Sequence, residues 1–145
     1  MAGIVVGVDL SDAGVAALRW AAQQARLTGE SLRAIHVLKL PDAYALAGLV
    51  GAAVEMPVES INSSYREALD AMWGSVEPDD GWSLEYVVDD PRGALVAASA
   101  EATLVVVGTR EHTGFERFLS GSVSHYVLSH ALCPVVAVPP ARITH

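Results

Sequence analysis

Glycine and serine residues in the carboxyl-terminal third have the types and spacing of an anion-binding site. Gly108 follows a run of aliphatic residues, and Gly121 stands thirteen residues later, ahead of Ser122 and Ser124. Glycine lets a ligand approach the main chain closely because it has no Cβ atom. Unpaired amides at a helix start attract anions, and serine hydroxyls there can donate hydrogen bonds. The pattern predicts a phosphate-binding loop and helix start, with simple helix capping as the alternative interpretation.

The other polar residues do not form a recognisable catalytic or metal-binding arrangement. His125 and His130 are five positions apart, which places them about 140° apart around a helix and prevents chelation of one metal ion. Glu111 and His112 are neighbours in a loop, and such neighbours need not converge as an acid and a base. No lysine follows a glycine-rich loop in the way that phosphoryl transfer commonly requires. We therefore expect a binding protein, not an enzyme, and no metal site.

Alternating strands and helices are predicted to position these residues. Apolar runs predict strands at 4–8, 32–38, 82–88, 104–107 and 135–138. Helical spacing and capping residues predict helices from about 11 to 28, 58 to 76, 91 to 102 and 121 to 130. This order favours an α/β fold, a doubly wound parallel sheet with helices on both faces. Ligands of such folds bind beyond the carboxyl ends of the strands, where Asp9, Val37 and Gly108 stand.

Length and charge narrow the class of protein. The chain has 145 residues, which predicts a single domain over 1–145. Nine basic and seventeen acidic side chains give a net charge of −8, which disfavours nucleic acid as a partner. No apolar run approaches the roughly 20 residues of a membrane span. No basic region precedes the first apolar run, so we expect a cytoplasmic protein without a signal peptide.

Several segments together resemble the universal stress protein family. They are residues 6–11 (VGVDLS), 35–37 (IHV), 104–110 (LVVVGTR), 119–128 (LSGSVSHYVL) and 130–135 (HALCPV). The resemblance extends over essentially the whole chain. It implies a Rossmann-like sheet of five parallel strands in the order 3-2-1-4-5 and a homodimer formed through the last strand, Val135–Val138. In one branch of the family it also implies ATP or another adenine nucleotide bound at the strand ends.

The resemblance also implies roles for individual residues. Gly108, Gly121 and Ser122 match the family's glycine signature and would contact phosphate and ribose. Asp9 and Val37 fall where the family contacts the base and its sugar. The full set of implied binding residues is Asp9, Val37, Val107, Gly108, Arg110, Gly121, Ser122, Val123 and Ser124.

One position departs from the family signature. Glu111 stands where the nucleotide-binding branch has its second glycine. A side chain and a negative charge at this place both oppose a triphosphate. The ligand implied by the resemblance is therefore ATP, AMP or cyclic AMP, of which those with fewer phosphates would be less affected by Glu111, and a magnesium ion is expected only if ATP binds. The alternatives are a dimeric adaptor that acts without a ligand, and slow ATP hydrolysis.

Overall fold

A five-stranded parallel sheet forms the centre of the molecule. The computed structural model describes residues 3–38, 63–88, 90–109 and 123–140. The strands are β1 (Ile4–Gly7), β2 (Leu32–Leu38), β3 (Ser83–Val88), β4 (Leu104–Gly108) and β5 (Val135–Val138). Their order across the sheet is β3-β2-β1-β4-β5, with every neighbouring pair parallel. The predicted fold class and strand order are therefore confirmed, with the first strand at the centre and the last at an edge.

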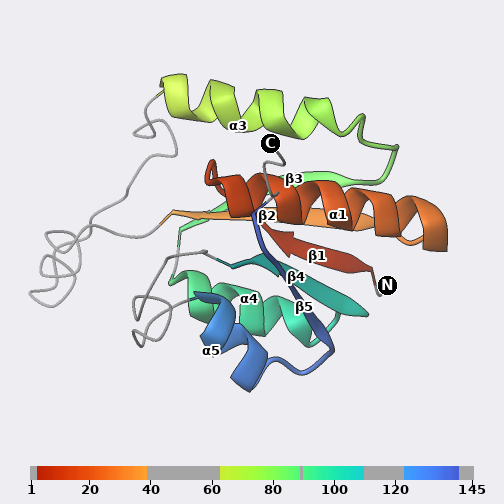
Figure 1. Cartoon of the computed structure of the whole chain (residues 1–145), viewed down its shortest axis with the longest axis vertical. Coiled ribbons are helices and arrows are strands. Elements are labelled where there is room, and N and C mark those ends of the chain that lie inside the picture. Colours follow the sequence, from red (N-terminus) through yellow and green to blue (C-terminus); the bar gives the residue numbers. More distant parts are fainter. Residues whose placement is uncertain (1–2, 39–62, 89, 110–122, 141–145) are drawn as a thin grey trace, which may run out of the picture.

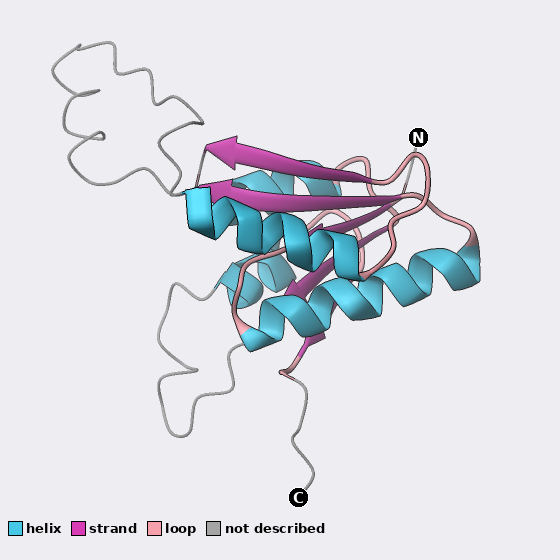
Figure 2. Cartoon of the chain, turned by 90° about the horizontal axis from the view of Figure 1, so that it is seen from above, coloured by secondary structure: helices cyan, strands magenta, loops and turns pink. Residues whose placement is uncertain are grey.

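In the described part of the chain, four helices cover the two faces of this sheet. They are α1 (Asp12–Thr28), α3 (Ser63–Ser75), α4 (Pro91–Ser99) and α5 (Val123–His130). Figure 1 shows α1 and α3 on one face and α4 and α5 on the other, and Figure 2 shows the same layers from above. The second predicted helix begins in the structure at Ser63, and positions 58–62 of that prediction lie outside the described residues. None of the helices in the described ranges has the length and apolarity needed to cross a membrane.

Alternation along each strand divides the core into two layers. Val6 and Val106 pack towards α1 and α3, whereas Val5, Val105 and Val107 pack towards α4 and α5. Successive side chains of a strand point to opposite faces, so a strand covered on both sides is apolar throughout. The central strands β1 and β4 show this pattern. Their side chains are used for packing on both faces, so a ligand can be reached only from the residues at their ends.

Helix caps fix where α1 starts and stops. Ser11 is the N-cap residue and its hydroxyl accepts a hydrogen bond from the backbone N–H of Gly14 at 3.0 Å. Gly29 ends the helix with φ 76°, a left-handed conformation that glycine adopts without strain. Both ends agree with the sequence-based prediction. As a result, the amino terminus of α1 stands directly after β1, next to Asp9.

Candidate functional site

The strand order reverses between β1 and β4. From β1 the chain builds outward through β2 to β3, and β4 then returns to the opposite side of β1. Ligands of doubly wound sheets bind at the carboxyl ends of the strands flanking such a reversal. In this protein the residues at that place are Asp9, directly after β1, and Gly108 with Thr109, at the end of β4. Figure 1 shows these strand ends on the side where α1 begins.

Asp9 is tied to the start of α1. Its Oδ1 atom accepts hydrogen bonds from the Ser11 backbone N–H, at 2.9 Å, and from the Ser11 hydroxyl. A Cβ atom at Gly14 would lie 2.6 Å from the Asp9 carbonyl oxygen and would also collide with Oδ1. Glycine at position 14 therefore lets the carboxylate sit against the first turn of α1. The sequence left open whether Asp9 caps the helix or contacts a ligand, and the structure places it in the cap network.

Val37 lies beside Asp9, just beyond the last paired residue of β1. The β1–β2 register ends at Gly7 opposite Ile35, and continuing it by two residues puts Asp9 opposite Val37. Residues of a parallel strand turn their main-chain groups alternately to the two neighbouring strands. Ile35 faces β1, since its carbonyl accepts from Val8 N–H at 2.9 Å, and therefore Val37 faces the same side. A donor and an acceptor of the main chain thus point into the space beyond β1.

Gly108 is required for packing between β4 and α1. A Cβ atom there would lie 2.6 Å from the carbonyl oxygen and 2.7 Å from the carbonyl carbon of Ala13, far inside van der Waals contact. The sequence analysis explained this glycine by the close approach of a ligand. In the structure the space next to its α-carbon is filled by α1. Close approach is indeed the reason for glycine, and the approaching group is the first turn of a helix.

The remaining predicted site residues divide into two groups. Val107 is 3% exposed and packs in the layer under α4 and α5, where Val123, the first residue of α5, packs too. Ser124 is buried in the first turn of α5. Arg110, Gly121 and Ser122 lie outside the described residues, as does Glu111.

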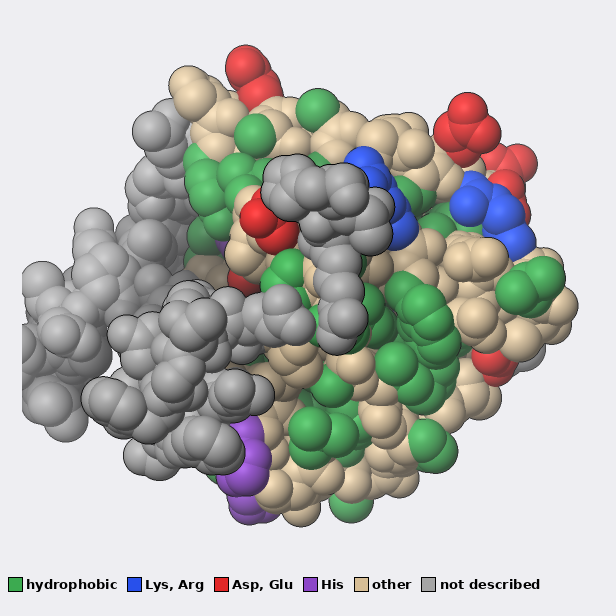
Figure 3. All heavy atoms as spheres, viewed as in Figure 1, with side chains coloured by type: hydrophobic (Ala, Val, Ile, Leu, Met, Phe, Trp, Pro, Cys, Tyr) green, Lys and Arg blue, Asp and Glu red, His purple; other side chains and the backbone are tan. Residues whose placement is uncertain are grey.

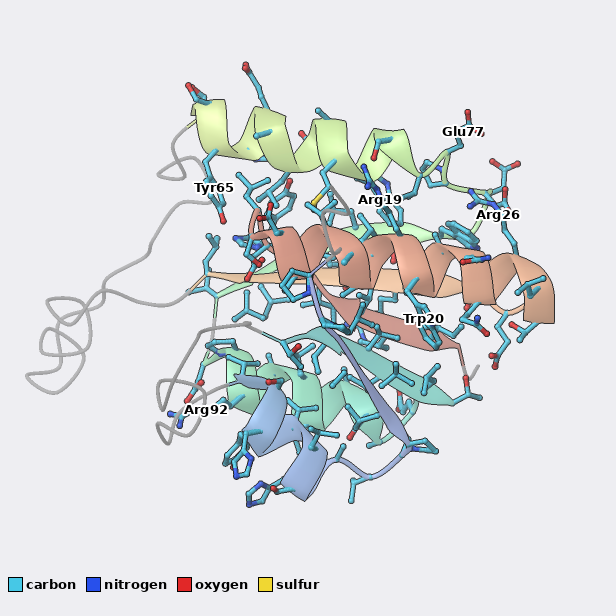
Figure 4. The ribbon with its side chains drawn as sticks, viewed as in Figure 1. Arg19, Trp20, Arg26, Tyr65, Glu77 and Arg92 are labelled. Carbon is cyan, nitrogen blue, oxygen red and sulfur yellow. The ribbon has the colours of Figure 1, made fainter. Side chains whose placement is uncertain are left out.

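Two tyrosines that pack against His36 were not predicted as site residues from the sequence. Tyr65, on the first turn of α3, points towards the start of α1 (Figure 4). Burial raises the pKa of its hydroxyl, and the negative charge of Asp9 raises it further, while a hydrogen bond with the Leu10 backbone lowers it. Tyr86, on β3, donates a hydrogen bond to Asp70 at 2.7 Å, and burial together with this bond raises its pKa to about 12. In the sequence they occupy periodic positions of a helix and of a strand, and core residues occupy the same kind of position, so the pattern does not distinguish the two.

A hollow lies beside the second half of α1, away from Asp9. It is a groove of about 430 Å³ between the second half of α1 and the chain segment Ser75, Val76 and Glu77. The Arg26 guanidinium donates hydrogen bonds there to the carbonyl oxygens of Val76 and, at 2.7 Å, Glu77. It also lies 4.9 Å from the centre of the Trp82 ring, and its Nη2 group is already used within the protein. Figure 4 shows Arg19, Arg26 and Glu77 around this groove. Arg26 thus ties the segment that follows α3 to the second half of α1, and the residues that line the groove include neither Asp9 nor Val37.

Metal-binding side chains do not cluster in the described ranges. There, no group of three or more His, Cys, Asp or Glu side chains is placed to hold a metal ion.

Comparison with known proteins assigns the family. Residues 2–139 match the model of the universal stress protein family. The chain belongs to this family. A universal stress protein of Mycobacterium tuberculosis is 37% identical over 135 residues, covering 93% of this chain and 44% of the relative. One from Mycolicibacterium smegmatis is 30% identical over 139 residues, covering 94% and 47%. This universal stress protein thus spans less than half the length of these curated relatives.

Solved structures of the family share the fold. A universal stress protein in complex with cAMP has a TM-score of 0.67 at 25% identity, covering 97% of this chain and 98% of its own. A universal stress protein from Archaeoglobus fulgidus has a TM-score of 0.66 at 25% identity, covering 95% and 93%. Another structure from the same organism, in complex with dAMP, has a TM-score of 0.62 at 23% identity, covering 95% and 98%, and supports the fold alone.

Proposed function

We propose that this universal stress protein acts by binding an adenine nucleotide with few phosphates, cyclic AMP or AMP, at the carboxyl ends of β1, β2 and β4. The supporting observation is that β2 extends past the last paired residue of β1, so that Val37 lies opposite Asp9 with no strand partner on its β1 side. An adenine ring presents a donor and an acceptor side by side, which a main-chain N–H and C=O match. The structurally similar family member in complex with cAMP adds to this argument.

Charge favours the smaller nucleotides. Asp9 is an acidic side chain at the described part of the site, and Glu111, which the family signature aligns with a glycine of the phosphate loop, would add a second carboxylate. Each phosphate added to the ligand increases the repulsion from these two carboxylates. The Ser11 hydroxyl beside the Asp9 carboxylate is engaged in capping α1, where it accepts from the Gly14 backbone N–H, so the proposal is recognition of the nucleotide without turnover.

Calorimetric titration of the purified protein with cyclic AMP, AMP and ATP tests the proposal. We expect binding of cyclic AMP or AMP to be at least about tenfold tighter than that of ATP, which corresponds to about 1.4 kcal/mol. Glu111→Gly is the matched variant, because it restores the family's glycine and removes one charge; it is expected to tighten ATP binding and to narrow the gap. Absence of binding for all three nucleotides at millimolar concentration would contradict the proposal and favour a ligand-independent adaptor.

We further propose that two copies of the chain pair through β5. Among the described residues this strand is at the edge of the sheet and pairs with β4 alone, with Val105 N–H donating to Pro134 and Thr109 N–H to Val138. By alternation, the main-chain groups of Val135 and Ala137 face outward. Figure 3 shows hydrophobic side chains along and beside this strand. An apolar edge strand of this kind favours pairing with another strand.

Ala137→Pro is the corresponding test. Proline removes the outward N–H of residue 137 and leaves the bonds to β4 intact, so the fold is expected to persist while the dimer dissociates. Sedimentation analysis at micromolar concentration should give a dimeric mass for the wild type and a monomeric mass for the variant. A monomeric wild type, or a variant that is still a dimer, would contradict pairing through this edge.

A further inference from the structure

His36 is a buried polar residue at the end of β2 to which no role has yet been assigned. Its side chain is 6% exposed and lies on the face of the sheet covered by α1 and α3. Its Nδ1 atom is 2.8 Å from the carbonyl oxygen of Val8, the residue before Asp9. A carbonyl oxygen only accepts hydrogen bonds, so Nδ1 carries a proton and donates it.

This hydrogen bond replaces one that a regular sheet would make. The β1–β2 ladder continues to the bond from Val8 N–H to Ile35. The next bond of a parallel ladder would join the N–H of Val37 to the carbonyl of Val8. Within the described parts of the chain no such backbone bond is present, and the imidazole of His36 occupies the Val8 carbonyl instead. The ladder therefore stops one bond early, next to Asp9.

Neighbouring rings hold the imidazole in this position. The His36 ring centre is 5.5 Å from that of Tyr65, with the planes at 47°, and 6.1 Å from that of Tyr86 in an edge-on arrangement. Tyr86 is itself fixed by its hydrogen bond to Asp70 and by the guanidinium of Arg66, 5.0 Å from its ring centre. The imidazole is thus packed between α3 and β3, with its Nδ1 atom directed at the end of β1.

We propose that His36 is a positioning residue of the nucleotide site: by taking the Val8 carbonyl, it keeps the main-chain N–H of Val37 unpaired and available to the ligand. The proposal rests on the function proposed above, since it assigns the Val37 amide to the nucleotide. It also predicts a change in main-chain hydrogen bonding that can be measured without a ligand. If the imidazole is removed, the Val8 carbonyl is left without a donor, and the Val37 N–H closes onto it.

Two amide variants separate this role from simple packing. Asparagine places its NH₂ group close to where Nδ1 of histidine stands, whereas glutamine places it nearer the position of Nε2. His36→Asn should therefore keep the bond to Val8, and His36→Gln should lose it. His36→Leu removes all donors and reports the effect of ring loss in an apolar site of similar volume.

Hydrogen exchange and ligand affinity give the two readouts. In the wild type and in His36→Asn, we expect the Val37 amide to exchange quickly and cyclic AMP to bind within about threefold of the same affinity. In His36→Gln and His36→Leu, Val37 exchange should slow at least tenfold, and cyclic AMP affinity should fall about tenfold. Thermal denaturation of each variant reports separately on the stability of the fold.

The outcomes distinguish this inference from the function on which it rests. If the wild type does not bind nucleotides, the proposed function fails, whatever the exchange data show. If the wild type binds cyclic AMP but the Asn and Gln variants lose affinity equally, His36 acts only through packing and the inference is wrong. A Val37 amide that is already protected in the wild type would overturn it independently of any ligand.

Discussion

Leu69→Ala is expected to lower the free energy of unfolding by about 2–5 kcal/mol, the usual effect of emptying a fully buried leucine site. Leu69 is 0% exposed and joins α3 to the layer that also contains Leu18 and Val6. Part of the loss comes from hydrophobic transfer and part from the cavity that remains. Because α3 also carries Tyr65 against His36, the variant should also loosen the end of β1.

Urea denaturation followed by circular dichroism measures this effect. Leu27→Ala is the matched control, since Leu27 is 71% exposed on α1 and its truncation should change stability by no more than about 0.5 kcal/mol. If the two variants had equal stability, α3 would not pack on the sheet as the structure shows.

Gly14→Ala is expected to destabilise the protein by about 1–3 kcal/mol, the usual cost of forcing an extra atom into a packed site. Helix propensity alone predicts the opposite sign, because alanine is favoured over glycine inside a helix by roughly 0.5–1 kcal/mol. The added Cβ atom would lie 2.6 Å from the carbonyl oxygen and 3.0 Å from the backbone nitrogen of Asp9. Relief of this clash must move Asp9 away from α1, so cyclic AMP binding should weaken as well.

Gly74→Ala provides the control for this prediction. Gly74 is also inside a helix, α3, and nothing lies within 4 Å of a Cβ atom built there. Its replacement should stabilise the protein by about 0.5–1 kcal/mol through helix propensity. Thermal or urea denaturation of both variants compares the signs directly. A stabilising effect at both positions would mean that Asp9 is not held against the first turn of α1.

The order of elements was readable from the sequence because each step leaves a local signal. The apolar runs of β1 and β4 reflect coverage on both faces, and Ser11 and Gly29 mark the ends of α1 through their capping chemistry. The strand order came from the family resemblance, since hydrophobic periodicity does not say which strands are neighbours. The apolar runs and the family resemblance both placed Asp9 and Val37 at strand ends, which is where the structure has them.

The contacts that shape the site were not readable in this way. Gly14 and Gly108 are glycines because α1 approaches Asp9 on one side and β4 on the other. These contacts join segments that are brought together by the fold, and local sequence patterns do not show which segments will be close in space. No local sequence pattern marks a role for His36, and only the sheet register shows that its ring replaces a bond of the ladder. The role of Glu111 rests on the sequence alone.

Amide NMR spectra recorded during titration with cyclic AMP test the central claim most directly. If the nucleotide binds at the reversal between β1 and β4, the amides of Asp9, Val37 and Thr109 should shift, while those of Ser75 and Glu77 at the groove beside Arg26 should not. Changes confined to that groove, or no changes at millimolar cyclic AMP, would contradict the account.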